Sequence, residues 1–102
     1  MTTSTIEAAA VRATSVEADD DTLTVELTDG RTIAVPLMWF PRLVNGTSDE
    51  RANWVPLADG AGLHWPALDE DISVAGLLQG QRSGESPKSF QKWLAARQQS
   101  AK

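Results

Sequence analysis

The sequence predicts a small α+β fold, in which a small antiparallel β-sheet with the hairpin 22–36 at its centre carries short helices on one side and a helix at the C-terminal end. Three observations support this class. Residues 22–36 alternate apolar and polar side chains, residues 36–80 carry prolines, glycines and cap residues that bound short helices, and residues 87–98 have helical apolar spacing. The 102 residues, 41% of them hydrophobic, suit one globular domain.

The chain begins with residues 1–10, rich in Thr, Ser and Ala, which we expect to be a flexible N-terminus. The α+β domain is expected over residues 11–80. Residues 11–18 are the first predicted strand, and the acidic triplet 19–21 is the predicted turn after it. We interpret the triplet as a solvated turn because it lacks the glycine and the spaced ligands of a calcium loop.

The register of the hairpin follows from its apolar residues. A two-residue Asp-Gly loop would place them on opposite faces. A three-residue loop over 28–30 instead pairs Val25 with Ile33. It also pairs Leu23 with Val35, so that one face is apolar throughout. We therefore predict a type I turn with a glycine bulge.

Two short helices are expected after the hairpin. Pro41 suits the first turn of a helix over residues 41–45. Thr47 and Glu50 match a capping box, in which the threonine caps the helix and the glutamate reaches back to it. That box predicts a second helix over about residues 48–54.

Two short strands, 55–57 and 63–65, are predicted to flank a glycine-containing turn. A third helix is predicted to end at Leu78, with Asp71 or Ser73 as its cap. The acidic residues before this helix are assigned to the positive end of its dipole. The alternative for these acids is docking of a basic partner, the chain's own tail included.

A polar linker, 81–86, leads to an amphipathic helix predicted over residues 87–98. Two interpretations of this helix stay open: it folds back onto the domain, or it docks in a groove of a partner protein. One face of the helix carries the partner-binding candidates, which are Phe90, Trp93, Leu94 and Arg97.

Charge is distributed unevenly along the chain. Residues 1–80 hold four basic and thirteen acidic residues, a net charge of −9, whereas residues 81–102 hold five basic residues and one acid, a net charge of +4. An acidic body repels the phosphates of nucleic acid, so direct binding to nucleic acid is not expected. The basic tail either packs on its own body or reaches an acidic partner.

The residues offer little for catalysis. There is no cysteine, and His64 is the one histidine, with no nucleophile-elbow motif to serve. His64 with Asp69 and Asp71 fits no usual metal-ligand spacing. We therefore expect a protein that is not an enzyme, with no catalytic residue, cofactor or metal site. Arg42 and Arg51 are expected to form ion pairs with carboxylates such as Asp49 or Asp69, and Trp39, Trp54 and Trp65 are expected to pack in or near the core.

The run from Leu23 to Gly80 resembles an uncharacterised bacterial family, domain of unknown function 2442. The resemblance implies a small α+β fold and carries no catalytic residue over to this chain. It also implies stand-alone members, members ahead of a helix-turn-helix domain, and members encoded beside a small partner in arrangements like toxin–antitoxin pairs. The matching residues are Leu27 to Arg31, Pro36, Leu37, Trp39, Pro41 to Leu43, Arg51 to Trp54, Asp59, Gly60, Gly62, His64 to Pro66, Leu68 to Ser73, Leu77 and Leu78.

Three hypotheses for function follow. The first is a non-enzymatic protein-interaction or regulatory module, the antitoxin-like member of a two-gene pair, whose partner is a small co-encoded protein or a second copy of the chain. The second is a regulator linked to a small molecule or nucleic acid. The third is a minor enzymatic role around His64. The start of the chain lacks signal-peptide character, and no run approaches the roughly 20 apolar residues of a membrane span, so a cytoplasmic location is expected.

Overall fold

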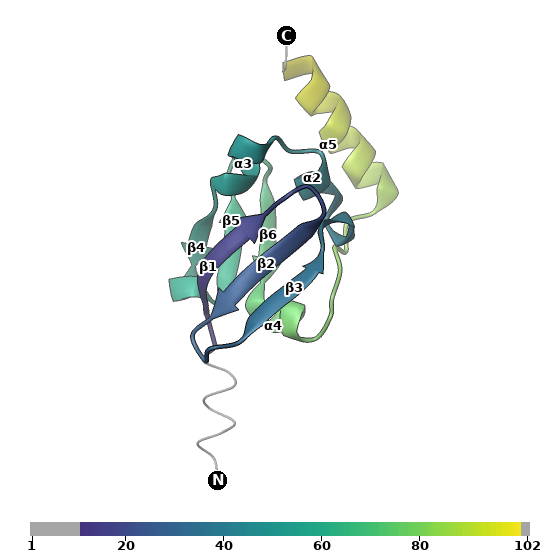
Figure 1. Ribbon diagram of the computed structural model, residues 1–102. Coiled ribbons are helices and arrows are strands. Elements are labelled where there is room, and N and C mark those ends of the chain that lie inside the picture. The colour runs from purple at the N-terminus through teal and green to yellow at the C-terminus, as the bar shows by residue number, and fades with distance from the viewer. Residues whose placement is uncertain (1–10, 101–102) are drawn as a thin grey trace.

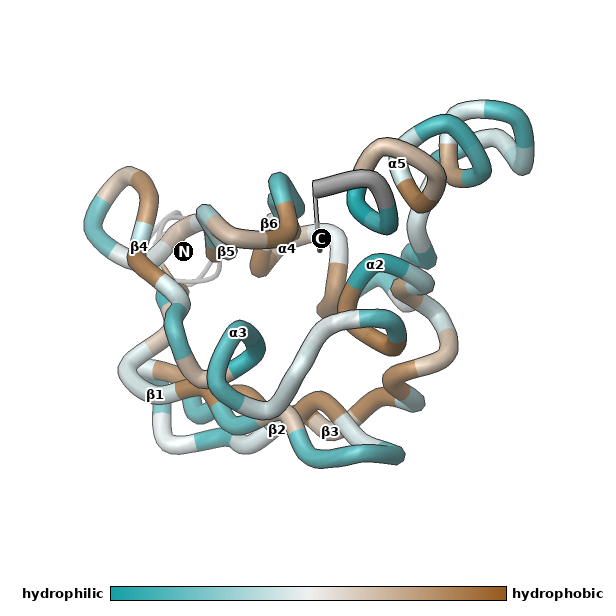
Figure 2. Tube along the Cα trace, turned by 90° about the horizontal axis from the view of Figure 1, so that it is seen from above, coloured by the Kyte–Doolittle hydropathy of each residue, from teal (hydrophilic) through white to brown (hydrophobic). Residues whose placement is uncertain are grey.

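Two three-stranded antiparallel sheets face each other across one core in the computed structural model, which describes residues 11–100 and their side chains through residue 98 (Figures 1 and 2). Seen from above in Figure 2, the sheets line opposite sides of the molecule. The first sheet has the order β1 (Ala13–Ala18), β2 (Thr22–Leu27), β3 (Thr32–Pro36), and the second has the order β4 (Val55–Leu57), β5 (Gly62–Trp65), β6 (Glu70–Ser73).

The hairpin of β2 and β3 has the predicted register. Val25 lies opposite Ile33, and Leu23 lies opposite Val35. Gly30 closes the turn with a φ of 92°, a left-handed conformation that glycine adopts at no steric cost, and its N–H donates to the Leu27 carbonyl at 3.1 Å. The three-residue loop is therefore confirmed, and β2 is the central strand of its sheet.

Short helices join and cover the ends of the sheets. The predicted capping box of α3 is confirmed: the Glu50 N–H donates to Thr47 Oγ1 at 3.1 Å, and the Thr47 N–H donates to Glu50 Oε1 at 2.8 Å. Each predicted helix is present within a residue or two of its expected bounds. The short helices are η1 (Leu37–Trp39), α2 (Pro41–Val44), α3 (Ser48–Ala52), η2 (Ala58–Gly60) and α4 (Val74–Leu78).

The α+β class is confirmed, but the strands divide between two sheets, and the interpretation of residues 69–71 as acids at a helix N-terminus is wrong. Residues 70 and 71 belong to β6, and α4 begins only after Ser73, whose Oγ accepts from the Gly76 N–H at 2.8 Å. Ile72 pairs with Leu63 and is buried, so pairing with β5 outweighs the local cap signal.

The core is apolar and lies between the sheets. Trp65 is fully buried and donates its indole N–H to the Arg51 carbonyl at 2.9 Å, while Trp39 and Trp54 are half-buried against the core. The expected packing role of these tryptophans is confirmed. The other core residues are Val11, Ala13, Leu23, Val25, Leu27, Val35, Leu37, Phe40, Leu43, Leu63, Leu68, Ile72, Val74 and Leu77.

Helix α5 (Pro87–Ser100) stands apart from the two sheets, beside α2 and beyond the end of the body (Figure 1). Phe90, Trp93, Leu94 and Arg97 are its half-buried residues, and its other side chains through residue 98 are exposed. None of the helices in the described part of the chain is long and apolar enough to cross a membrane. The prediction for residues 1–10 lies outside the described residues.

Candidate functional site

The connection between α4 and α5, residues 81–86, crosses the body as an ordered segment that we call the strap. The Ser83 N–H donates to the Trp39 carbonyl at 3.1 Å. The Arg82 guanidinium lies 4.8 Å from the centre of the Trp39 ring. These contacts fix the path of the strap and the start of α5.

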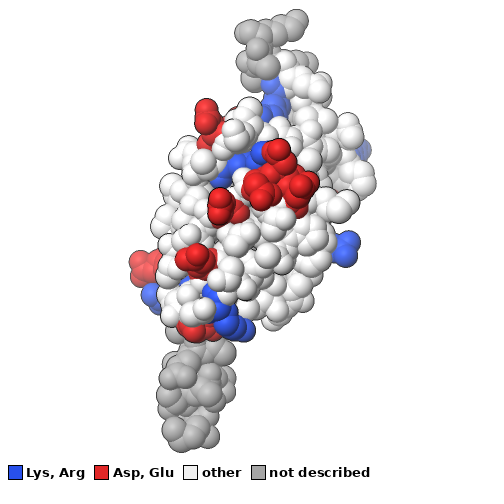
Figure 3. Space-filling view, in the orientation of Figure 1, with Lys and Arg blue, Asp and Glu red and all other residues white. Residues whose placement is uncertain are grey.

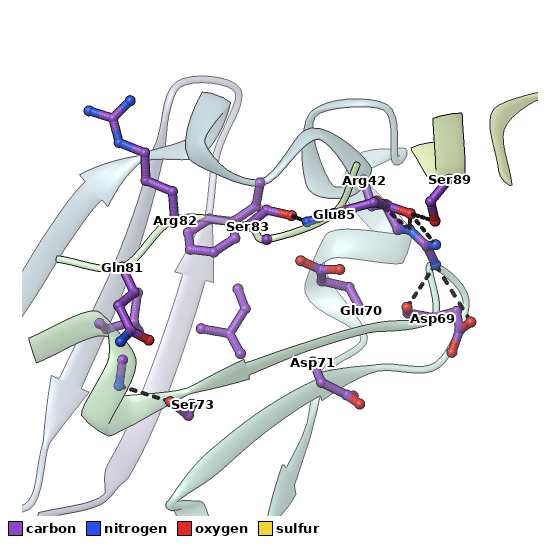
Figure 4. Close-up of a pocket in the computed structure, with 15 residues that line it drawn as sticks. Arg42, Asp69, Glu70, Asp71, Ser73, Gln81, Arg82, Ser83, Glu85 and Ser89 are labelled. Atoms are coloured by element: carbon purple, nitrogen blue, oxygen red, sulfur yellow. Dashed lines mark hydrogen bonds and ion pairs between the residues drawn. The ribbon is translucent and has the colours of Figure 1, made fainter. Parts of the chain in front are cut away.

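Arg42, on α2, binds the strap to the body. Its Nε donates to both Glu85 carboxylate oxygens, at 3.0 and 3.1 Å, and its Nη1 donates to the Asp69 carbonyl at 2.9 Å (Figure 4). The Asp69 carboxylate lies 3.5 Å from the same guanidinium, so the predicted Arg42–Asp69 pair is present. The hydrogen bond from Arg42 holds the pKa of Glu85 below its usual range.

Trp93 anchors α5 through contacts with two guanidinium groups. The Arg42 group lies 5.0 Å from the centre of the Trp93 ring, and the Arg97 group lies 5.5 Å from it. Phe90 stacks on the same tryptophan with its ring centre 5.8 Å away. The face of α5 predicted for partner binding therefore contacts its own body in this structure.

Arg97 attaches the second half of α5 to α3. Its Nη1 donates to Glu50 Oε2 at 3.0 Å, and its Nη2 donates to the other Glu50 oxygen and to the Asn45 carbonyl. Hydrogen bonds from Arg97 and then from the Thr47 N–H lower the pKa of Glu50 to about 2. The residue that completes the capping box of α3 is thus also an anchor for α5.

These contacts form one continuous series, Glu85–Arg42–Trp93–Arg97–Glu50, which we call the ladder. Its five side chains come from the strap, α2, α3 and α5. Only Trp93 packs against the apolar core, and only in part. Helix α5 is therefore positioned mainly by charge and by cation–π contacts.

A groove of about 700 Å³ lies between α5 and the body. Its apolar surface comes from Trp93, Leu94, Ala96 and Ala67, while the Glu50–Arg97 pair forms part of its wall and neutralises its own charge. Three of the four predicted partner-binding residues line the groove, and Phe90 stacks behind Trp93. The complete lining is Asn45, Glu50, Ala67, Trp93, Leu94, Ala96, Arg97 and Gln98.

A second hollow, a cleft of about 450 Å³, lies between the strap and β6 (Figure 4). Glu70 points into it, between the Arg42–Glu85 pair and the strand. Burial raises the pKa of Glu70 to about 7. In the sequence Glu70 was grouped with its acidic neighbours; its place on the same face of β6 as the buried Ile72 becomes evident only once β6 is known.

Arg51 and His64 have structural partners. Arg51 is buried, and its Nη1 donates to the carbonyls of Leu43 and Gly46 while its Nη2 pairs with Asp20 at 2.8 Å. The carboxylate partner of Arg51 is thus Asp20, because the turn after β1 lies over α3. Asp49 and Asp69 were the examples expected from the sequence.

His64, on β5, contacts the carboxylate of its cross-strand neighbour Asp71 through Nδ1. Asp69 lies instead beside Arg42, so the three residues weighed as metal ligands do not converge. Residues 11–98 hold no group of three or more His, Asp or Glu side chains suited to a metal ion.

Acidic side chains gather where β1 turns into β2, at the end of the molecule from which α5 extends (Figure 3). Asp19, Asp20 and Asp21 form this turn and are exposed. Lys88 and Lys92 are exposed on α5. The acidic turn and the basic helix α5 therefore lie toward the same end of the molecule.

The family model for a protein of unknown function, DUF2442, matches residues 13–83. The matched region includes Arg42, Glu50 and Glu70, whereas Glu85, Trp93 and Arg97 lie beyond it. The ladder thus joins side chains inside the matched region to side chains outside it. No protein with curated annotation matches this chain in sequence.

Two solved structures share the fold. A crystal structure of a protein of unknown function from Rhodospirillum rubrum is similar over 74% of this chain and 93% of its own, with 31% identity and a TM-score of 0.64. The solution structure of an uncharacterized protein from Chromobacterium violaceum is similar over 94% of this chain and 84% of its own, with 20% identity and a TM-score of 0.63. With a family model that matches most of its length and this fold, the chain belongs to the DUF2442 family.

Proposed function

We propose that the protein is a non-enzymatic interaction module, and that the groove between α5 and the body is its binding surface. One observation carries this proposal: the ladder holds α5 away from the core and so leaves a formed groove with an apolar surface. A groove that exists before binding reduces the conformational entropy that a partner must overcome.

The residues of the groove suit recognition of a protein segment. Trp and Arg are enriched among the residues that dominate binding energy at interfaces, and Trp93 and Arg97 lie side by side here. Ala67 and Ala96 are small, so a partner backbone can approach closely. The fit is to an apolar helical or extended segment that packs on Trp93 and Leu94.

The partner that we propose is a small protein, with this chain as the regulatory, antitoxin-like member of the pair. The family resemblance supports a co-encoded partner of this kind. A second copy of the chain is the other partner that the sequence suggests.

Affinity purification from the native host tests this function. The full-length chain is compared with the double variant Trp93→Ala/Leu94→Ala and with a control, Lys88→Ala/Gln91→Ala, which alters exposed positions of the same helix. We expect the full-length chain and the control to retain a stoichiometric partner and the groove variant to lose it. A partner that stays bound to the folded groove variant would contradict the proposed surface.

The cleft beside the strap favours a second candidate function, the binding of a small molecule. Its lining is rich in charged and polar groups around a half-buried carboxyl, that of Glu70. Trp93 and Leu94 do not line the cleft. A ligand that binds the Trp93→Ala/Leu94→Ala variant as tightly as the full-length chain therefore belongs to the cleft and separates the two functions.

A further inference from the structure

Glu70 is a half-buried carboxyl in the cleft beside the strap. It is opposite the fully buried Trp65 across β5 and β6, and it shares a strand face with the buried Ile72. No donor among residues 11–98 forms a hydrogen bond with its carboxylate. The charged form of Glu70 is therefore costly, and that cost depends on what surrounds the cleft.

Glu70 lies among one guanidinium group, that of Arg42, which has the largest single charge effect on it, and three carboxylates. Arg42 faces it from α2 but is already bonded to Glu85, on the strap, and lies beside Asp69, in the turn before β6. Asp71 is next along β6.

The other charged groups near the cleft are occupied elsewhere. Arg82, on the strap, stacks on Trp39. His64 reaches the cleft only through its contact with Asp71. Helix α4 contributes Gly76 and Leu77 to the lining, neither of them charged.

The ionised form of Glu70 and the attached position of the strap therefore disfavour each other. The Glu85 carboxylate disfavours the charge on Glu70, and by linkage the charge on Glu70 disfavours Glu85 in its place beside Arg42. Ionised Glu70 also competes for Arg42, which is a member of the ladder. Weakening the Arg42–Glu85 pair loosens both the strap and the contact of Arg42 with the Trp93 ring.

We propose that the protonation state of Glu70 controls how firmly the strap and α5 are held against the body. With Glu70 neutral, Arg42 stays on Glu85 and the ladder is complete. With Glu70 ionised, the strap loosens and α5 becomes mobile. The idea rests on the proposed function, since α5 is one wall of the groove and its release would alter the binding surface.

The pKa of Glu70, about 7, places this change in the neutral range, as burial demands. His64 contacts Asp71, the neighbour of Glu70 on β6, so a change at His64 could also reach the cleft. A test must therefore separate Glu70 from His64.

Nuclear magnetic resonance of the full-length chain between pH 5 and 9 provides the test. The side-chain carboxyl carbon of Glu70 reports its ionisation, while the Trp93 indole N–H and the heteronuclear Overhauser effects of α5 amides report the hold on α5. We expect both sets of signals to change together with a midpoint near pH 7, and α5 to be more mobile at high pH. In Glu70→Gln, α5 should keep its low-pH signals throughout.

His64→Gln is the matched control, and it should titrate as the unaltered chain does. An α5 transition that persists in Glu70→Gln, or that disappears in His64→Gln, would overturn the proposal. So would a Glu70 carboxyl that ionises in the unaltered chain with no response from α5, a result that does not depend on Glu70→Gln folding. None of these readouts needs a partner, so they test the role of Glu70 alone. Partner capture at pH 6 tests the groove alone. A failure of the Glu70 proposal is therefore distinguishable from a failure of the proposed function.

Discussion

The two-sheet core and the attachment of α5 are built from different interactions. Between the sheets, leucines, valines and Trp65 exclude water almost completely. At the attachment of the strap and α5, two ion pairs and the contacts of Trp93 with two guanidinium groups hold the helix, and most of its side chains are exposed. The core is closed to solvent, whereas the attachment of α5 is partly exposed.

The two kinds of interaction differ in how much stability they contribute and in how strongly they respond to charge. Full burial of a large apolar side chain contributes about 1.5–3 kcal/mol. A solvent-accessible ion pair contributes about 0.2–1 kcal/mol and is screened by salt. The core can therefore hold the body rigid while small changes in charge shift the position of α5.

Matched tryptophan substitutions are expected to show the largest contrast. Trp65→Ala leaves a cavity in the core and an unpaired Arg51 carbonyl, so we expect a loss of about 3–5 kcal/mol in the free energy of unfolding. Trp93→Ala should cost about 1 kcal/mol or less, because its ring packs on charged groups at the surface. Urea unfolding followed by circular dichroism measures both.

The same pair of variants tests whether α5 and the core differ in their contribution to stability. If Trp93→Ala destabilises the whole protein as much as Trp65→Ala does, α5 belongs to the cooperative unit of the core. Trp54→Ala, a half-buried tryptophan outside the ladder, is the control and should fall between the two. Should Trp65→Ala fail to fold, Trp65→Phe keeps most of the volume and preserves the ranking.

Local signals in the sequence predicted the elements well because each rests on neighbouring residues. The hairpin register followed from the alternation of Leu23 and Val25, and the start of α3 followed from Thr47 and Glu50. The division into two sheets did not follow. It depends on β6 pairing with β5. The acidic residues at 69–71 were interpreted as residues before a helix, so the strand was not predicted.

The candidate site was predicted by residue but not by arrangement. Trp93, Leu94 and Arg97 were identified from helical spacing, and they do line one hollow. Their partners on the body lie far away in sequence: Arg97 and Glu50 are separated by 47 positions. Spacing rules describe neighbours along one helix, so they cannot pair charges across the fold.

Glu70 is an ionisable group at the edge of the core, where the apolar region meets the charged one. Its pKa is raised from the ordinary 4.5 to about 7, so the folded state binds the proton more tightly and stability falls as pH rises through this window. Glu70→Gln should therefore raise the free energy of unfolding by about 1–2 kcal/mol at pH 8 and by nothing near pH 4. The full shift would give more, but water reaches the cleft and screens it.

Denaturation curves of Glu70→Gln and the unaltered chain at pH 4, 6 and 8 measure this difference. Glu26→Gln, which alters an exposed glutamate on β2 away from the cleft, is the control and should lack the gain at pH 8. A gain for Glu70→Gln that is constant across pH would indicate better packing of the amide and not relief of a buried charge.

Salt should produce the smallest effect and the cleanest separation of the two regions. In about 1 M salt the screening length falls to about 3 Å, which weakens the Arg42–Glu85 and Arg97–Glu50 pairs and leaves apolar burial intact. We expect amide hydrogen exchange in α5 to accelerate about 1.4- to fivefold, the factor that about 0.2–1 kcal/mol allows, while amides of β2 and β5 keep their rates. Equal acceleration in the strands would mean that salt acts on global stability. Unchanged exchange in α5 would mean that Trp93 and its cation–π contacts hold the helix without the ion pairs, because such contacts depend on desolvated close approach more than on long-range charge.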